Sequence, residues 1–150
     1  MFQTIMRQFL LERPGKKWTM SAWGEKLNAS GEKIERRLEK APDSERNRQT
    51  LSHIVGIELW GQSRLRVGLG DPFKEEEYDG YRPSRSRSWE QLKAEFRLAR
   101  KKSVALAEAL DDQQVDQFMQ VNHNQYGMIT LGAWLRYLDM HANLESKRIK

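Results

Sequence analysis

Residues 130–149 read TLGAWLRYLDMHANLESKRI, and their apolar side chains recur at the spacing of an α-helix. Steps of three and four residues put six apolar side chains and one glutamate on a single face: Leu131, Trp134, Leu135, Leu138, Ala142, Glu145 and Ile149. Thr130 stands where a helix N-cap is expected. A helix with one apolar face buries that face against other elements, so this stretch predicts a helix at residues 130–149 within a helical core.

Three more segments carry the same pattern, at about residues 21–41, 44–69 and 88–110. Ser88 and Gln91 have the spacing of a capping box at the start of the last of these. Four helices of this length, each with one apolar face, predict an all-α fold, a four-helix bundle in a single domain over residues 1–150. A short extra helix is expected near the N-terminus, ended by Pro14 and Gly15.

The segments between these helices carry no strand signal. Residues 70–87 hold several glycines and prolines and an acidic run, which indicates a long surface connection, and connections of this length are often functional. Residues 111–128 are polar and are expected to be irregular, with no alternation of apolar and polar side chains.

Composition excludes several classes of protein. The 150 residues contain no cysteine, so disulfide scaffolds, thiolate metal sites and a cysteine nucleophile are excluded. No run approaches the roughly 18 apolar residues of a membrane span, and the start lacks the pattern of a signal peptide. These features predict a soluble, cytoplasmic protein without a membrane partner.

The net charge of +5 permits a nucleic-acid partner but does not indicate one. The cations between Lys93 and Lys102, which include Arg97 and Arg100, are interpreted as a solvated helix face. Base-stacking aromatic residues are not interleaved with these charges, so nucleic-acid binding is not expected.

Two carboxylates stand where the helical pattern asks for apolar residues. Glu58 projects between Ile54 and Leu65, and Glu145 lies within the apolar face of residues 130–149. A buried carboxylate needs a partner, a cavity or a raised pKa. Glu58 is therefore a candidate catalytic residue, a general base or a support for a site, and the alternative is a carboxylate satisfied by a buried polar network.

A candidate metal site follows from the histidines. His141 and Glu145 lie four residues apart, one turn apart on one side of a helix. If the helix at 44–69 packs beside this one, His53 can supply a third ligand, and two imidazoles with a carboxylate suit Zn, Fe, Mn or Ni. The alternative is a simple ion pair between His141 and Glu145. His123, in a polar loop, is interpreted as a turn residue and not as a ligand.

Three stretches together resemble one known family. They are LSHIVGIELWGQSRLRVGLG at 51–70, EEYDGYRPSRSRSWEQL at 76–92 and HNQYGMITLGAWLRYLDMHANLE at 123–145. Their order and spacing, over about residues 21–149, resemble the DinB-like superfamily. The resemblance implies a four-helix bundle with a divalent-metal site and frequent dimers. The superfamily's usual three histidines fall on His53, His141 and position 145, where this chain has glutamate.

The resemblance also implies a class of activity. It suggests a divalent-metal-dependent enzyme, a hydrolase or a thiol-dependent transferase, that acts on a small molecule and forms a homodimer. Trp60 and Tyr81 would line the pocket, and the cofactor would be Zn, Ni, Fe or Mn. Because Glu145 departs from the three-histidine pattern, the alternative is a non-catalytic bundle whose metal site is degenerate or lost, which binds a small ligand or serves in a stress response.

Overall fold

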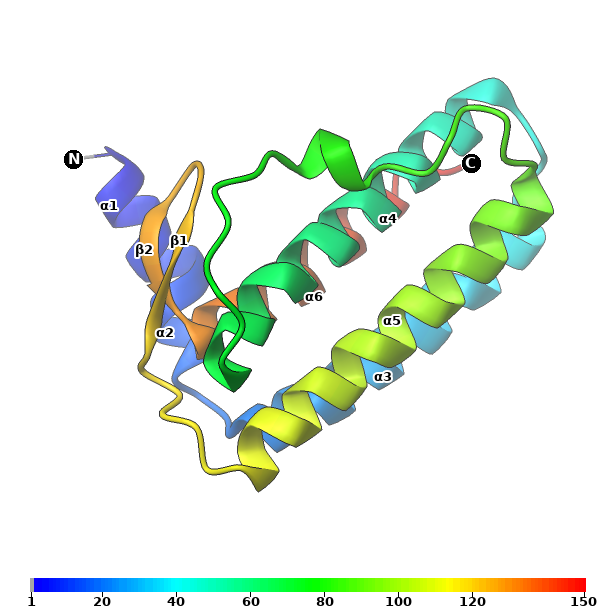
Figure 1. The fold of residues 1–150 in the computed structure, drawn as a ribbon. Coiled ribbons are helices and arrows are strands. Elements are labelled where there is room, and N and C mark those ends of the chain that lie inside the picture. The colour runs from blue at the N-terminus through cyan, green and yellow to red at the C-terminus, as the bar shows by residue number, and fades with distance from the viewer. Residues whose placement is uncertain (1) are drawn as a thin grey trace.

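The computed structural model describes residues 2–150, which are mostly helical with one small two-stranded sheet (Figure 1). A helical N-terminal segment comprises α1 (Phe2–Met6), the π-helical turn η1 (Arg7–Glu12) and α2 (Arg13–Gly15). The long helices are α3 (Met20–Lys40), α4 (Glu45–Leu65), α5 (Trp89–Asp112) and α6 (Leu131–Ser146). Two 3₁₀ turns, η2 (Arg66–Leu69) and η3 (Tyr78–Tyr81), lie between α4 and α5.

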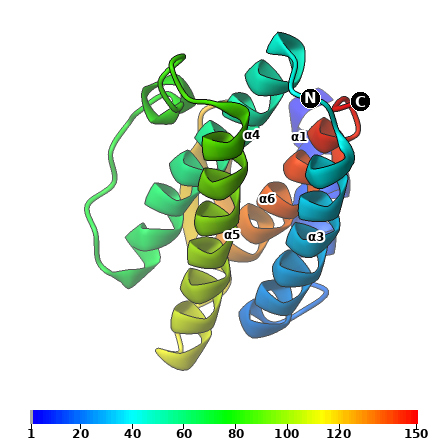
Figure 2. The same ribbon diagram turned by 90° about the vertical axis from the view of Figure 1, so that its right-hand side faces the viewer.

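Each long helix packs against two others. Both α3 and α4 contact α5 and α6, so the four helices lie side by side around a shared core (Figures 1 and 2). Four hydroxyl side chains cap their N-termini, as the sequence predicted for two of them: Thr19, Ser44, Ser88 and Thr130. Ser88 and Gln91 form the predicted capping box.

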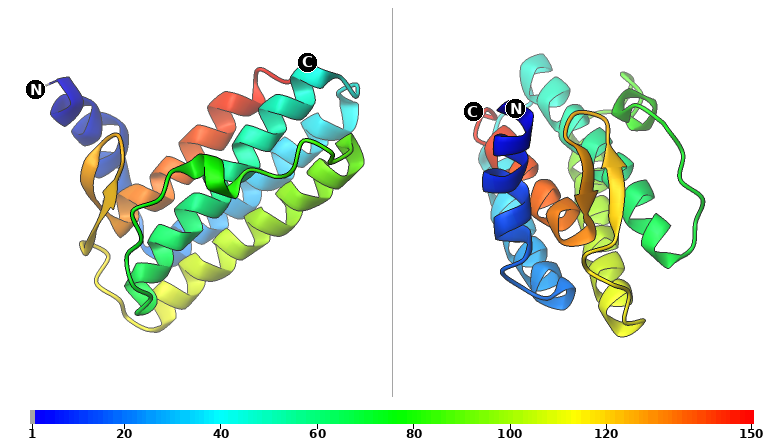
Figure 3. Two further views of the ribbon diagram at one scale, coloured as in Figure 1. Left: turned by 45° about the horizontal axis from the view of Figure 1, so that its top comes forward. Right: turned by 90° about the vertical axis from the view of Figure 1, so that its left-hand side faces the viewer.

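The long connection between α4 and α5 has a geometric cause. The two helices are neighbours that run in the same direction, so the chain must return along the whole of α4 before α5 begins (Figures 1 and 3). At 1.5 Å per residue, the 21 residues of α4 span about 30 Å. The connection at residues 70–88 covers this distance, and its turn η3 packs on α4. The prediction of a long surface connection is confirmed.

The prediction of irregular structure at residues 111–128 is wrong in part. β1 (Gln120–His123) pairs antiparallel with β2 (Gly127–Thr130), and Val121 faces Ile129. The hairpin lies beside η1 and leads directly into α6 (Figure 3). Each strand has only four residues, which is too short for alternation to stand out in the sequence.

The helix ends also differ from the predicted ones. The helix expected at 130–149 ends at Ser146, and the one expected at 44–69 is α-helical only to Leu65 before it tightens into η2. The helix expected at 88–110 continues to Asp112. Within residues 2–150, no helix has both the length and the apolar character needed to cross a membrane.

Candidate metal centre

The structure brings together the three residues proposed from the sequence as metal ligands. His53 comes from α4, and His141 and Glu145 come from α6. One donor atom of each lies within 4.8 Å of the other two, and the Nε2 atoms of the two histidines are 3.1 Å apart. All three side chains are half-buried, so the cluster is partly shielded from water and still open to it.

Close packing of α4 on α6 makes this convergence possible. Gly61 lies opposite Leu138, and a Cβ atom at Gly61 would stand only 2.5 Å from Leu138 Cδ2. The absence of a side chain at position 61 thus lets the two helices approach at this level. His141 and Glu145, one turn apart on α6, then face His53 across the same interface.

The geometry of the donors fits a transition-metal ion. An ion about 2.0–2.1 Å from each of two imidazole nitrogens, in a tetrahedral arrangement, separates the nitrogens by about 3.3 Å. The observed 3.1 Å between His53 Nε2 and His141 Nε2 is close to this value. Glu145 also accepts a hydrogen bond from Arg148 at 3.2 Å, which leaves its carboxylate accessible on the remaining side.

Burial keeps both imidazoles in the form that binds metal. Loss of solvent lowers the pKa of His141 to about 4, and the neighbouring His53 acts in the same direction. Burial also lowers the pKa of His53, against the opposing charge of Glu145. Neutral imidazoles carry the lone pair that a metal ion needs, so no proton has to leave at neutral pH.

Two tyrosines that the sequence analysis did not name form walls of the site. The Tyr78 ring, from η3, meets His53 edge-on with ring centroids 5.1 Å apart, and the Tyr137 ring lies 5.7 Å from that of His141. Burial raises the pKa of Tyr137, so its hydroxyl remains a hydrogen-bond donor. Tyr137 precedes His141 by four residues, so the spacing argument that identified Glu145 also predicts that Tyr137 lies beside His141.

Trp60 and Tyr81, expected to line a pocket, both bind the connection instead. Trp60 Nε1 donates to the Glu76 carbonyl oxygen at 2.9 Å, and the Tyr81 hydroxyl donates to the Glu76 carboxylate. Trp60 touches the ring of Tyr137 at a centroid distance of 6.4 Å. Trp60 therefore fixes the connection over α4 and supports the Tyr137 wall of the site, whereas the Tyr81 hydrogen bond lies within the connection itself.

Glu58, the predicted catalytic residue, lies outside the histidine cluster. Its carboxylate is buried and accepts hydrogen bonds from Arg100 Nε at 2.8 Å, Arg100 Nη2 at 3.0 Å and Ser103 Oγ at 2.6 Å. Arg100 also donates to Ser30, which in turn donates to Asp139 on α6. The carboxylate is thus satisfied by a buried polar network that joins all four long helices.

The solvated face expected between Lys93 and Lys102 is only partly present. Arg100 and Lys93 expose 3% and 7% of their surface, whereas Lys101 and Lys102 are exposed. Arg100 is buried because its partner Glu58 lies on a different helix, 42 residues away in the sequence. A pattern within one helix does not reveal such a partner.

His123 takes the turn role predicted for it. Its Nδ1 accepts hydrogen bonds from the backbone N–H groups of Gln125 and Tyr126, which close the hairpin loop. Burial lowers the pKa of His123 to about 3, and the nearby Arg64 acts in the same direction. Its ring packs among aromatic side chains, including Trp134 and Tyr137, and it is not one of the three clustered donors, although Tyr137 also contacts His141.

No protein-family model, curated protein or solved structure matches this chain. The case for a function depends on the residues described above: two neutral imidazoles, one accessible carboxylate and a wall of tyrosines, supplied by two closely packed helices and one connection.

Proposed function

We propose that the protein is a four-helix bundle of the DinB-like kind and binds one divalent transition-metal ion through His53, His141 and Glu145. The observation that carries the proposal is the convergence of three donor atoms, from two helices, within 4.8 Å of one another. Two imidazoles and one carboxylate suit Zn, Ni, Fe or Mn and leave coordination positions for water or substrate.

The proposed activity is that of a metal-dependent hydrolase or thiol-dependent transferase acting on a small molecule. A bound ion would supply a Lewis acid that lowers the pKa of a bound water or thiol. Tyr137 keeps its proton and is available to donate a hydrogen bond at the site, and Tyr78 limits access from the side of the connection. Glu58 acts as a positioning residue that fixes α4 against α5 through Arg100.

Metal analysis with a matched pair of variants tests the metal site. We expect about one equivalent of metal per chain after incubation with Zn, Ni, Mn or Fe(II), measured by elemental analysis after desalting. His53→Gln should lose the metal, whereas His123→Asn, which changes the histidine outside the cluster, should retain it. Wild-type protein that stays metal-free with all four ions would overturn the proposal.

A second candidate function has its own support. The 3.1 Å between the two Nε2 atoms is also the length of an N–H···N hydrogen bond, which would join α4 to α6 without an ion. In that case the protein is a non-catalytic bundle, and His141→Ala lowers its stability by the same amount with and without a chelator. If the protein binds metal, the chelator should lower the stability of the wild type but not that of the His141→Ala variant.

We further propose a homodimer. Several large apolar side chains of the N-terminal segment are exposed, namely Phe2, Ile5 and Phe9, and pairing of two copies would cover them. Sedimentation should then give about twice the 17.7 kDa of one chain. A single-chain mass at micromolar concentration would contradict this assembly.

A further inference from the structure

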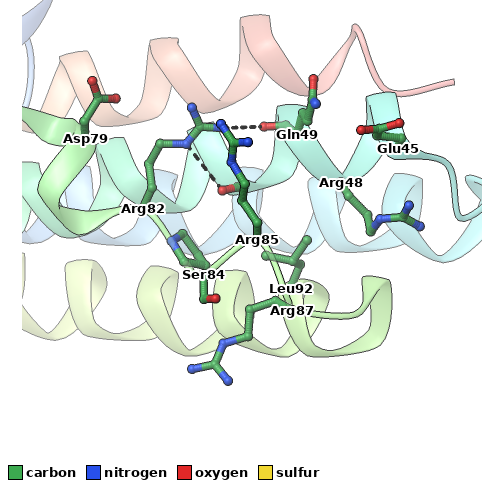
Figure 4. Close-up of a pocket in the computed structure, with 11 residues that line it drawn as sticks. Glu45, Arg48, Gln49, Asp79, Arg82, Ser84, Arg85, Arg87 and Leu92 are labelled. Atoms are coloured by element: carbon green, nitrogen blue, oxygen red, sulfur yellow. Dashed lines mark hydrogen bonds between the residues drawn. The ribbon is translucent and has the colours of Figure 1, made fainter.

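An arginine-rich groove lies beside the candidate metal centre. It has a volume of about 720 Å³ and is bounded by the first half of α4, the end of the connection and the start of α5 (Figure 4). Four arginines line it, which are Arg48, Arg82, Arg85 and Arg87, and we call it the arginine groove. Its volume lies in the range of small-molecule sites and far exceeds that of a single inorganic anion.

Among the described residues, two of the four arginines have no carboxylate partner. Arg48 pairs with Asp43, and Arg87 Nε lies 2.9 Å from Glu95 Oε1. Within residues 2–150, no carboxylate oxygen comes within 4.0 Å of a charged nitrogen of Arg82 or Arg85. Their positive charges are therefore available to a ligand.

Arg82 is held in place by groups that do not neutralise it. Its Nε donates to Ser52 Oγ at 3.4 Å, and its Nη2 donates to the Gln49 carbonyl oxygen at 3.2 Å. Its main chain rests on Gly56 of α4, where an added Cβ would stand 2.8 Å from Arg82 Cγ and 3.4 Å from Arg82 Cα. Since a guanidinium carries five N–H donors, several remain free for an oxyanion.

Two carboxylates flank the arginines along the groove. In Figure 4, Arg82 and Arg85 both reach from the connection toward α4, with Asp79 at one end of the groove and Glu45 at the other. The groove neighbours the candidate metal centre: Ser52, which lines it, precedes His53, and the groove residue Asp79 follows Tyr78, whose ring packs against that of His53. Pro83 and Leu92 add apolar surface to the lining.

We infer that the arginine groove binds the phosphate group of a small organic phosphate through Arg82 and Arg85, and presents the rest of the molecule to the metal centre. Two unpaired guanidinium groups match the double negative charge and the planar oxygen pairs of a phosphate monoester. The inference deepens the proposed function and rests on it for the reaction, whereas binding of the phosphate itself does not require the metal ion.

Calorimetric titration of chelator-treated, metal-free protein tests the binding. The ligands are phenyl phosphate, inorganic phosphate and succinate at constant ionic strength. We expect phenyl phosphate to bind, with inorganic phosphate weaker and succinate weakest. Arg82→Gln and Arg85→Gln should each weaken phenyl phosphate binding by about tenfold or more, as expected for a lost charge-assisted hydrogen bond. Arg46→Gln removes the same charge from an exposed position on α4 outside the groove and should change the affinity by less than about twofold.

The outcomes separate this inference from the proposed metal site. If Arg46→Gln and Arg82→Gln weaken phenyl phosphate binding equally, the inferred binding site is wrong, because the affinity then follows the net charge of the protein alone. Tighter binding of succinate than of phenyl phosphate would overturn the ligand class. Metal content of the Arg82→Gln variant, measured in parallel, should equal that of the wild type. Loss of phosphate binding with normal metal content is therefore a failure of the groove and not of the metal centre.

Discussion

The role of Glu58 depends on Arg100, a partner on another helix that the sequence pattern around Glu58 does not indicate. Both of its carboxylate oxygens accept hydrogen bonds from Arg100 deep between the helices. We predict that Glu58→Leu lowers the free energy of unfolding by about 3–5 kcal/mol, because it leaves the Arg100 guanidinium buried and unpaired. Denaturant unfolding monitored by circular dichroism measures the loss.

The control for this prediction removes both charges. The double variant Glu58→Leu, Arg100→Met should recover most of the lost free energy, because apolar side chains of similar size replace the pair. A single Glu58→Leu variant as stable as the wild type would contradict the assignment of Glu58 to the buried network. The same result would restore it as a free carboxylate available for catalysis.

His123 predicts a pH dependence of stability. Its pKa is about 3 in the folded chain and near 6.5 in an unfolded one, so between these values only the unfolded state binds the proton. The contribution of His123 to stability is therefore complete above about pH 6.5 and declines by about 1.4 kcal/mol per pH unit below it, until the pH approaches the folded pKa. Urea unfolding at pH 7, 6, 5 and 4 measures the slope.

His123→Asn is the matched variant for that measurement. The Asn side-chain oxygen can accept the same turn hydrogen bonds as Nδ1, while the amide does not titrate. We expect the variant to show a shallower loss of stability with falling pH, whatever its absolute stability. An unchanged slope would show that His123 binds the proton equally in the folded and unfolded states.

At the scale of elements, the contact between α4 and α6 is set by Gly61. Alanine normally stabilises a helix by about 1 kcal/mol relative to glycine, but here its Cβ would strike Leu138. We predict that Gly61→Ala instead lowers the free energy of unfolding by about 1–3 kcal/mol through overpacking. In a Leu138→Ala background, where space is available, the same change should be neutral or stabilising.

The sequence predicted elements better than the contacts between them. Residues 21–41 and 130–149 were recognisable as helices because each carries an apolar face over several turns. The hairpin was not, since its four-residue strands offer too few positions for alternation to stand out.

Part of the candidate site could be predicted because two of its ligands lie close together in the sequence. His141 and Glu145 lie one turn apart on a single helix, so spacing alone places them together, and the expected packing of the helix at 44–69 beside it supplied His53, in agreement with the family resemblance. The pairing of Glu58 with Arg100 and the packing of Tyr78 on His53 join segments far apart in the chain. Neither follows from the periodicity of one helix.

At the scale of the whole molecule, metal binding predicts a shift in thermal stability. An ion that binds only the folded state stabilises it by about 2.7 kcal/mol at a hundredfold excess over the dissociation constant. For a domain of this size, that corresponds to a rise of about 5–10 °C in Tm. A chelator should reverse the rise in the wild type and have no effect on His53→Gln. Identical melting of the wild type with and without the chelator would contradict metal binding.

The parallel course of α4 and α5 also has an electrostatic consequence. Their N-termini lie at the same end of the molecule, and each contributes the equivalent of about half a positive charge there from aligned peptide dipoles. Glu45 and Glu90 in their first turns complement these dipoles. The arginine groove lies at this end with four arginines against the carboxylates of Glu45 and Asp79, so an approaching anion meets a positive field before it touches a side chain. Because salt screens such a field beyond about 8 Å, added salt should slow the arrival of the ligand more than it hastens its departure.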